Sequence, residues 1–116
     1  MTTANEWNDI CGIDDLVDNS GVCALLGEKQ IAIFTQNRDQ QTIFATDNYD
    51  PIGKANVLYR GILGSVANKN VVASPLYKQR FCLHTGQCLD DPEQQINTYP
   101  VKVVDQRVLI QMALAE

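Results

Sequence analysis

Short apolar runs separated by turn signals extend along the whole chain, and this pattern limits the fold more than any other feature of the sequence. The runs that we expect to be strands are 7–11, 21–26, 30–35, 41–46, 71–73, 80–83, 101–104 and 107–111. Residues 14–17 suggest one helical turn, and glycine and proline break 47–64 into a structured loop with at most a short helix. No long stretch has helical periodicity, and we expect the strand at 30–35 to be covered on both faces, because Ile31 and Ile33 alternate with Ala32 and Phe34. Many short strands with frequent turns predict an all-β sandwich or small barrel.

Size and composition place the chain among soluble single-domain proteins. The 116 residues fit one domain, and 45% of them are hydrophobic. No apolar run approaches the roughly 18 residues that a membrane-spanning helix needs, and we see no signal peptide, so we expect a cytoplasmic protein without membrane contact. The net charge of −5 argues against nucleic-acid binding. The four cysteines include no Cys-x-x-Cys pair, so we expect reduced thiols.

Charge is distributed unevenly along the chain. Residues 51–89 contain five basic residues and no acidic residue, whereas 1–50 contain nine acids and two bases, and 90–116 contain five acids and two bases. The five bases are Lys54, Arg60, Lys69, Lys78 and Arg80. The sequence therefore predicts a positive region on an otherwise acidic protein.

The same basic stretch contains most of a set of motifs that occur in a defined order. The motifs are TIFATDN (42–48), DNYDPIG (47–53), YRGILG (59–64), VASPLY (72–77), FCLHTGQC (81–88) and YPVKV (99–103). Together they resemble the Rieske iron–sulfur domain, in which Cys-Pro-His and Cys-Pro-x-His loops supply two thiolates and two imidazoles to a [2Fe–2S] cluster. The resemblance implies an all-β Rieske-type antiparallel β-sandwich. Residues 1–116 would form a single domain, with 47–89 as a small, loop-rich, degenerate cluster-binding-like subdomain.

None of the positions that match the Rieske ligands holds cysteine or histidine. The resemblance places the ligand positions at Asp50, Ile52, Ser74 and Tyr77. Isoleucine has no donor atom, and the serine and tyrosine hydroxyls stay protonated near pH 7, so Asp50 is the one anion of the four. We therefore expect no metal here. Ile52 and Tyr77 are larger and more apolar than the ligands they replace, and we expect them to fill the vacated volume.

Two further runs refine the resemblance. WNDIC (7–11) and NYDP (48–51) look most like the small subunit of bacterial NADH-dependent nitrite reductase. That resemblance implies a cytoplasmic complex that reduces nitrite to ammonium, in which the large subunit carries FAD, sirohaem and an iron–sulfur cluster. This chain would then be a non-catalytic small subunit that binds the large subunit and supports it without carrying a cluster.

The basic stretch supplies the candidate contact residues. They are Lys54, Arg60, Lys78 and Arg80, with Tyr49, Tyr59 and Tyr77 interleaved. Arginine and tyrosine are enriched in interface hot spots, and a positive tip would orient the protein toward an acidic patch. The alternatives are chance charge on a solvated face, a Rieske-like ferredoxin-type electron-transfer protein, or a free-standing protein-binding module. We predict no catalytic residue, since His84 is the only histidine and no nucleophile motif surrounds Ser74.

Overall fold

The computed structural model describes residues 6–37 and 42–112. Its strands are β1 (Glu6–Gly12), β2 (Ser20–Leu26), β3 (Lys29–Asn37), β4 (Thr42–Asp47), β5 (Tyr49–Asp50), β6 (Ala55–Asn56), β7 (Ile62–Val66), β8 (Lys69–Ala73), β9 (Arg80–Cys82), β10 (Thr98–Tyr99), β11 (Val101–Val104) and β12 (Arg107–Met112). Two single-turn 3₁₀ helices, η1 (Ile13–Asp15) and η2 (Leu58–Arg60), complete the described part. The predicted strand start at residue 41 lies outside the described residues.

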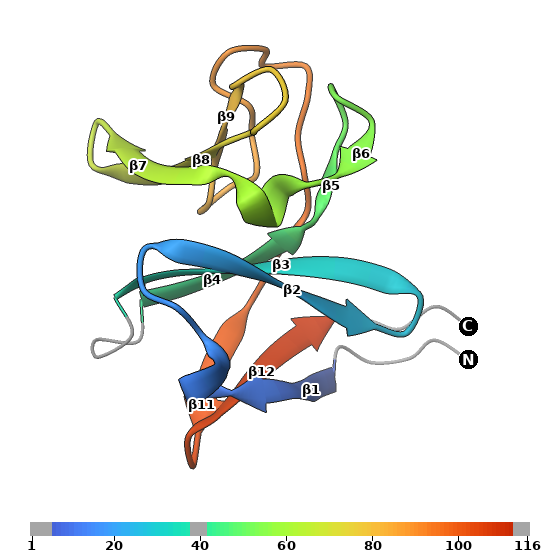
Figure 1. Ribbon diagram of the computed structural model, residues 1–116, viewed down its shortest axis with the longest axis vertical. Helices are drawn as coiled ribbons and strands as arrows, with labels where there is room; N and C mark the ends of the chain where they lie inside the picture. Colours follow the sequence, from blue (N-terminus) through green and yellow to red (C-terminus); the bar gives the residue numbers. More distant parts are fainter. Residues whose placement is uncertain (1–5, 38–41, 113–116) are drawn as a thin grey trace.

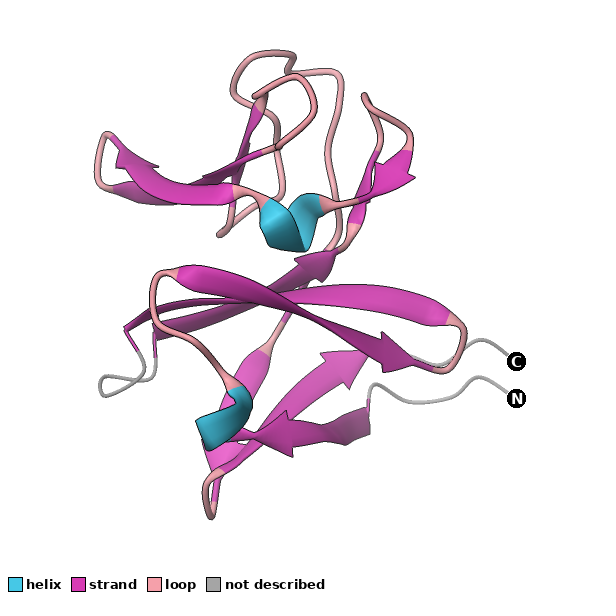
Figure 2. Ribbon diagram, in the orientation of Figure 1, coloured by secondary structure: helices cyan, strands magenta, loops and turns pink. Residues whose placement is uncertain are grey.

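The strands form small antiparallel sheets at three levels (Figure 1). A four-stranded sheet of order β10-β4-β3-β2 lies in the middle, and a three-stranded sheet of order β1-β12-β11 lies below it. The β7-β8-β9 sheet and the β5-β6 hairpin lie above it and are connected by long loops (Figure 2). This arrangement confirms the predicted all-β antiparallel fold. No helix among the described residues is long and apolar enough to cross a membrane.

Strand β3 separates two hydrophobic cores, which explains why its sequence is apolar at consecutive positions. Side chains alternate across a strand. Ile31 and Ile33 face the lower core together with Leu16, Val108 and Ile110. Ala32 and Phe34 face the upper core, whose other buried members are Leu58, Val72, Phe81, Leu83, Cys88 and Ile96. The prediction that this strand is covered on both faces is confirmed. The assignment of 47–89 to a subdomain stays a prediction, and the upper core also takes in Ile96.

The segment 47–64 holds more strand than the sequence predicts. The short helix is present as η2, but residues 62–66 form β7, which pairs along its full length with β8. The connection is a two-residue turn in which Ala67 and Asn68 have φ of 52° and 67°. Such a turn suits the twist of a hairpin, yet alanine is not a turn signal, so the hairpin was missed.

A glycine with positive φ fixes the loop that follows β9. Gly86 has φ of 84°, and a Cβ there would lie 1.9 Å from the Ile96 carbonyl oxygen. Its amide donates to the Cys82 carbonyl at 2.7 Å, and its own carbonyl accepts from the Ile96 amide at 2.8 Å. The loop therefore folds back onto the chain that returns to β10. All four cysteines are free thiols in this structure.

Candidate functional site

The two loops that resemble ligand loops are built alike. We call residues 50–54 loop A and residues 74–78 loop B. Loop A connects β5 to β6 and loop B leads from β8 toward β9, and in each a proline follows the first residue. Each loop ends on a lysine in the left-handed region, Lys54 with φ of 59° and Lys78 with φ of 64°. The Lys54 amide donates to the Asp50 carbonyl at 2.7 Å, and the Lys78 amide donates to the Ser74 carbonyl at 3.0 Å.

The first side chain of each loop caps its own turn. Asp50 Oδ1 accepts from the Ile52 amide at 2.8 Å and from the Gly53 amide at 3.1 Å. Ser74 Oγ accepts from the Leu76 amide at 3.3 Å. Aspartate and serine favour such turns because their short side chains reach the backbone two residues ahead. These two residue types therefore maintain the loop backbone at the positions where the resemblance expects cysteine.

Loops A and B touch each other directly. Ser74 Oγ donates to Asp50 Oδ2 at 2.5 Å, and the two residues are 1% and 0% exposed. A second contact joins Gly53 to Leu76, where a Cβ on the glycine would lie 2.4 Å from Leu76 Cδ1. The two first-position side chains thus point at each other, and the loops are held together by a hydrogen bond and by close packing.

The donor set at the four matching positions does not fit a [2Fe–2S] cluster, whose irons take thiolate and imidazole ligands. The side-chain oxygens of Asp50 and Ser74 bond each other and the loop amides. Ile52 packs against the upper core, as a volume-filling residue would. Tyr77 does not fill the site, because it is 65% exposed and points to solvent, so that prediction is wrong. Residues 6–37 and 42–112 contain no group of three or more His, Cys, Asp or Glu that could hold a metal ion.

The two arginines of the basic stretch already have partners within the protein. Arg80 Nη2 lies 2.8 Å from Asp90 Oδ1, and the Arg80 amide donates to Asp90 Oδ2 at 2.8 Å. These hydrogen bonds from Arg80 lower the pKa of the Asp90 carboxyl. Arg60 lies over the Tyr59 ring at 5.5 Å and donates from Nε to the Tyr59 hydroxyl at 3.0 Å. The positive region is therefore narrower than the sequence predicts, since the fold brings Asp90 from the next segment against it.

The two loop lysines are in a different situation. Lys54 and Lys78 are exposed, and neither forms an ion pair within the part of the chain that the structure describes. They belong to the adjoining loops A and B, which connect β5 to β6 and β8 to β9 in the upper part of Figure 1, and Tyr77 directly precedes Lys78 in the chain. Tyr49, on β5, is 45% exposed. Lys54 therefore lies on loop A, Tyr77 and Lys78 lie on the adjoining loop B, and Arg60 lies with Tyr59 on η2.

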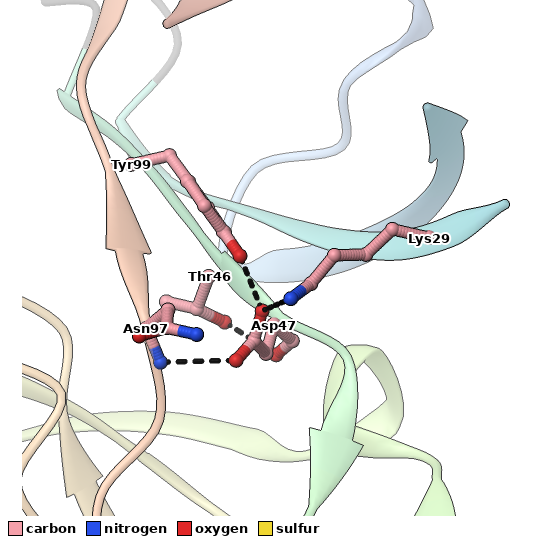
Figure 3. Close-up of polar contacts among 5 residues, drawn as sticks. All are labelled: Lys29, Thr46, Asp47, Asn97 and Tyr99. Atoms are coloured by element: carbon pink, nitrogen blue, oxygen red, sulfur yellow. Dashed lines mark hydrogen bonds and ion pairs between the residues drawn. The ribbon is translucent and has the colours of Figure 1, made fainter. Parts of the chain in front are cut away.

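A polar cluster that the sequence did not single out lies where the chain leaves the middle sheet and where it returns (Figure 3). Asp47 Oδ1 accepts from the Tyr99 hydroxyl at 2.5 Å and lies 3.1 Å from Lys29 Nζ. Asp47 Oδ2 accepts from the Asn97 amide at 3.1 Å. Burial and the hydrogen bond to Asp47 raise the pKa of Tyr99. Asp47 ends β4, and Asn97 and Tyr99 lie at β10, so the cluster fastens both connections to the upper part.

Asn48 positions the entry into loop A from inside the protein. Its side chain is fully buried, and its Nδ2 donates to Gln30 Oε1 at 3.0 Å and to the Asn56 carbonyl at 3.1 Å. Its Oδ1 accepts from the Tyr59 amide at 2.8 Å. One amide therefore joins β3, β6 and η2. The signal available in the sequence was the pair of polar residues, 47 and 48, that directly follows an apolar strand.

Comparison with known proteins places this geometry among close relatives. Residues 6–111 match the family described as Rieske-like [2Fe-2S] domain. The chain is 44% identical over 101 residues to the nitrite reductase (NADH) small subunit of Escherichia coli K12, covering 87% of this chain and 93% of that protein. It also superimposes on the crystal structure of a putative NADH-dependent nitrite reductase small subunit from Mycobacterium tuberculosis. The TM-score is 0.85 at 34% identity, over 96% of this chain and 98% of that one.

One relative differs in length. The nitrite reductase [NAD(P)H] large subunit of Klebsiella oxytoca is 42% identical to this chain over 104 residues. The match covers 90% of this chain but 11% of that protein. In the Klebsiella protein, a segment like this chain is therefore part of a much longer polypeptide.

Proposed function

The chain belongs to the Rieske-like [2Fe-2S] domain family and, within it, to the nitrite reductase (NADH) small subunits, and we propose that it works as a non-catalytic subunit. It binds the large subunit of a cytoplasmic NADH-dependent nitrite reductase and supports the reduction of nitrite to ammonium. FAD, sirohaem and an iron–sulfur cluster reside on the large subunit. This chain holds no [2Fe–2S] cluster of its own, and it forms a single domain in which 47–89 is the degenerate cluster-binding-like subdomain.

The observation that carries this proposal is the hydrogen bond between Asp50 and Ser74. In a cluster-binding domain, the residues at these positions point toward iron. Here they point at each other, both are buried, and the remaining acceptor atom of the carboxylate is used by loop amides. A carboxylate–hydroxyl pair can connect the two loops without metal, but it cannot accept and pass on an electron.

The Klebsiella large subunit supports the choice of partner. A segment resembling this chain lies within that protein, so the equivalent domain and the rest of the large subunit share one polypeptide there. A domain that is covalently joined to its partner in one organism is a good candidate for a bound subunit in another. Because the two are joined in one polypeptide in Klebsiella, we also expect one copy of this chain for each large subunit.

Two measurements on the purified protein test the absence of a cluster. We expect a colourless protein with no visible absorbance and with iron far below one atom per chain. A brown protein with two irons per chain would make it an electron carrier of the ferredoxin type. Anaerobic purification from cells with active cluster assembly is the stringent condition, because loss of a labile cluster is then avoided.

Reconstitution with the large subunit tests the subunit role. The two proteins should co-elute on gel filtration, and nitrite-dependent NADH oxidation, or the thermal stability of the large subunit, should increase when this chain is added. Full rate and full stability of the large subunit alone would exclude a supporting role. Failure to co-elute at micromolar concentrations would favour a free-standing binding module.

A further inference from the structure

We propose that loops A and B together form one preformed docking face, made of Lys54, Leu76, Tyr77 and Lys78. Leu76 and Tyr77 are the apolar anchors of this docking face, and the two lysines are its charged rim. Such a face fits an apolar pocket bordered by carboxylates on a protein partner. The inference rests on the proposed function, because the partner it implies is the nitrite reductase large subunit, and it names the residues that make the contact.

The anchors are two consecutive large side chains that the fold leaves in solvent. Leu76 is 45% exposed and Tyr77 is 65% exposed, although both lie on a loop whose first residue is buried. Large exposed side chains of this kind become hot spots when a partner buries them, and tyrosine is enriched at such positions. The exposed parts of both side chains therefore offer apolar area to a partner, while the covered part of Leu76 packs against Gly53.

Charge selects the kind of partner. Elsewhere in the described residues, Lys29, Arg80 and Arg107 are each paired with an aspartate. Lys54 and Lys78 have no such partner, and they end two loops that touch each other. Two unpaired cations on the two adjoining loops, one of which carries the apolar anchors, complement carboxylates that border an apolar pocket, and they increase the rate of association with an acidic surface.

The docking face is fixed before any partner arrives. The Asp50–Ser74 hydrogen bond joins the loops, and Gly53 contacts the Leu76 side chain. Both lysines are held in the left-handed conformation by amide-to-carbonyl hydrogen bonds within their own loops. A preformed surface loses little conformational entropy on binding, so more of the contact energy becomes affinity. The internal contacts thus explain how a small face of four residues can contribute substantially.

Other contacts within the protein keep the two arginines out of the docking face. Arg80 is bound to Asp90 by its side chain and its amide, and Arg60 lies on Tyr59. A charge reversal at Arg80 would therefore disturb the fold as well as any interface. Lys69 and Leu25 are the matched controls, because both are exposed and neither belongs to loop A or B. Lys69 lies at the β7–β8 turn and Leu25 on β2 (Figure 1).

The test is binding of the full-length chain to the cognate large subunit, measured by surface plasmon resonance from 50 to 500 mM salt. Leu76→Ser should weaken the complex at least about tenfold, mainly through faster dissociation, as expected for an anchor. Lys54→Glu with Lys78→Glu should weaken it at least about tenfold at low salt, mainly through slower association, and the difference should shrink at high salt. Leu25→Ser and Lys69→Glu should bind like wild type.

The results distinguish failure of the docking face from failure of the proposed subunit role. Equal loss of affinity in the control variants, or no loss in the loop variants, overturns the docking face while the subunit role stands. No binding by the wild-type chain overturns both. Each variant is first checked by its thermal unfolding midpoint, so that reduced binding is attributed to the surface only when the fold is unchanged. A doubly substituted Leu76→Ala, Tyr77→Ala chain, which adds no polar group, repeats the anchor test independently.

Discussion

The lower and upper parts of the protein are stabilised by different interactions. The lower core consists of apolar side chains from paired strands, among them Ile31, Ile33 and Ile110. The upper part also buries polar groups, and Asn48, Asp50 and Ser74 are each at most 1% exposed. Apolar packing tolerates the exchange of one apolar side chain for another of similar volume, whereas a buried polar group depends on each partner being present. The upper part is therefore the more sensitive to single substitutions that change chemistry without changing size.

The largest effect should come from Phe34, because it lies on the strand that both parts share. Its side chain is fully buried in the upper core, while its neighbour Ile33 packs in the lower core. Phe34→Ala should lower the free energy of unfolding by about 4 kcal/mol, the usual cost of truncating a buried phenylalanine. Urea denaturation should show a single transition by near-UV and far-UV circular dichroism. Two separated transitions would mean that the parts unfold independently.

Asp50→Ala should have the next largest effect and should be confined to the upper part. The substitution leaves the Ile52 and Gly53 amides and the Ser74 hydroxyl without their acceptor. We expect a loss of about 3 kcal/mol, since hydrogen bonds to a charged group are strong and their buried partners remain. Hydrogen exchange should accelerate at the amides of loops A and B more than in β12.

Ser74→Ala is the companion variant, because it removes the hydrogen bond between the loops and the weaker one from the Leu76 amide, and leaves the two amide contacts of Asp50 intact. It should cost about half as much as Asp50→Ala, within the range for removing a partner of a buried group. Equal costs for the two variants would show that the hydrogen bond between the loops, and not the capping of loop A, is the main contribution of the carboxylate.

The sequence predicted the lower part better than the upper part, because apolar packing leaves a pattern in the sequence and polar contacts between distant residues do not. Alternation of Ile31, Ala32, Ile33 and Phe34 indicated a strand buried on both faces, and burial confirms it. Charge along the chain could not show that Asp90 would neutralise Arg80, because that pair forms only when the loop after β9 folds back. The size of the Tyr77 side chain suggested that it fills the volume of the missing cluster, but loop B leaves this side chain exposed to solvent.

The positions that matched Rieske ligands were located by resemblance, yet their interactions could not be derived from it. Asp50 and Ser74 are 24 residues apart, and no local pattern indicates that a carboxylate and a hydroxyl so far apart will pair. The Asp47 cluster was missed for a similar reason, since Tyr99 and Asp47 are 52 residues apart. Polar contacts between distant residues depend on tertiary placement, whereas apolar periodicity is visible in a short window.

Tyr99→Phe tests the connection between the two parts with a smaller expected effect. Removing the hydroxyl that donates to Asp47 should cost about 1 kcal/mol, because the site is only half-buried. Burial and the bond to Asp47 raise the pKa of Tyr99 in the folded protein, against an opposing effect of Lys29. The contribution is therefore fully present below the unfolded-state pKa of about 10 and is lost as pH rises through the folded-state pKa. Stability of the wild type should fall more steeply than that of the variant above about pH 10.

The smallest effects should come from the surface ion pairs. Comparing one ion pair from the lower part with one from the upper part tests whether Arg80 contributes to stability or to partner binding. Arg107 pairs with Asp9 on the lower sheet, where both side chains are about half exposed, so Arg107→Gln should barely change the unfolding midpoint. In Arg80→Gln, Asp90 still accepts from the backbone amide, so this variant should also unfold almost like wild type. Because Arg80 lowers the pKa of Asp90, its contribution should be present above the ordinary aspartate pKa of about 4 and should disappear as pH falls. A large loss of stability at neutral pH in Arg80→Gln would make this pair part of the framework of the upper part. A small loss together with unchanged binding would leave Lys54 and Lys78 as the cations available to a partner.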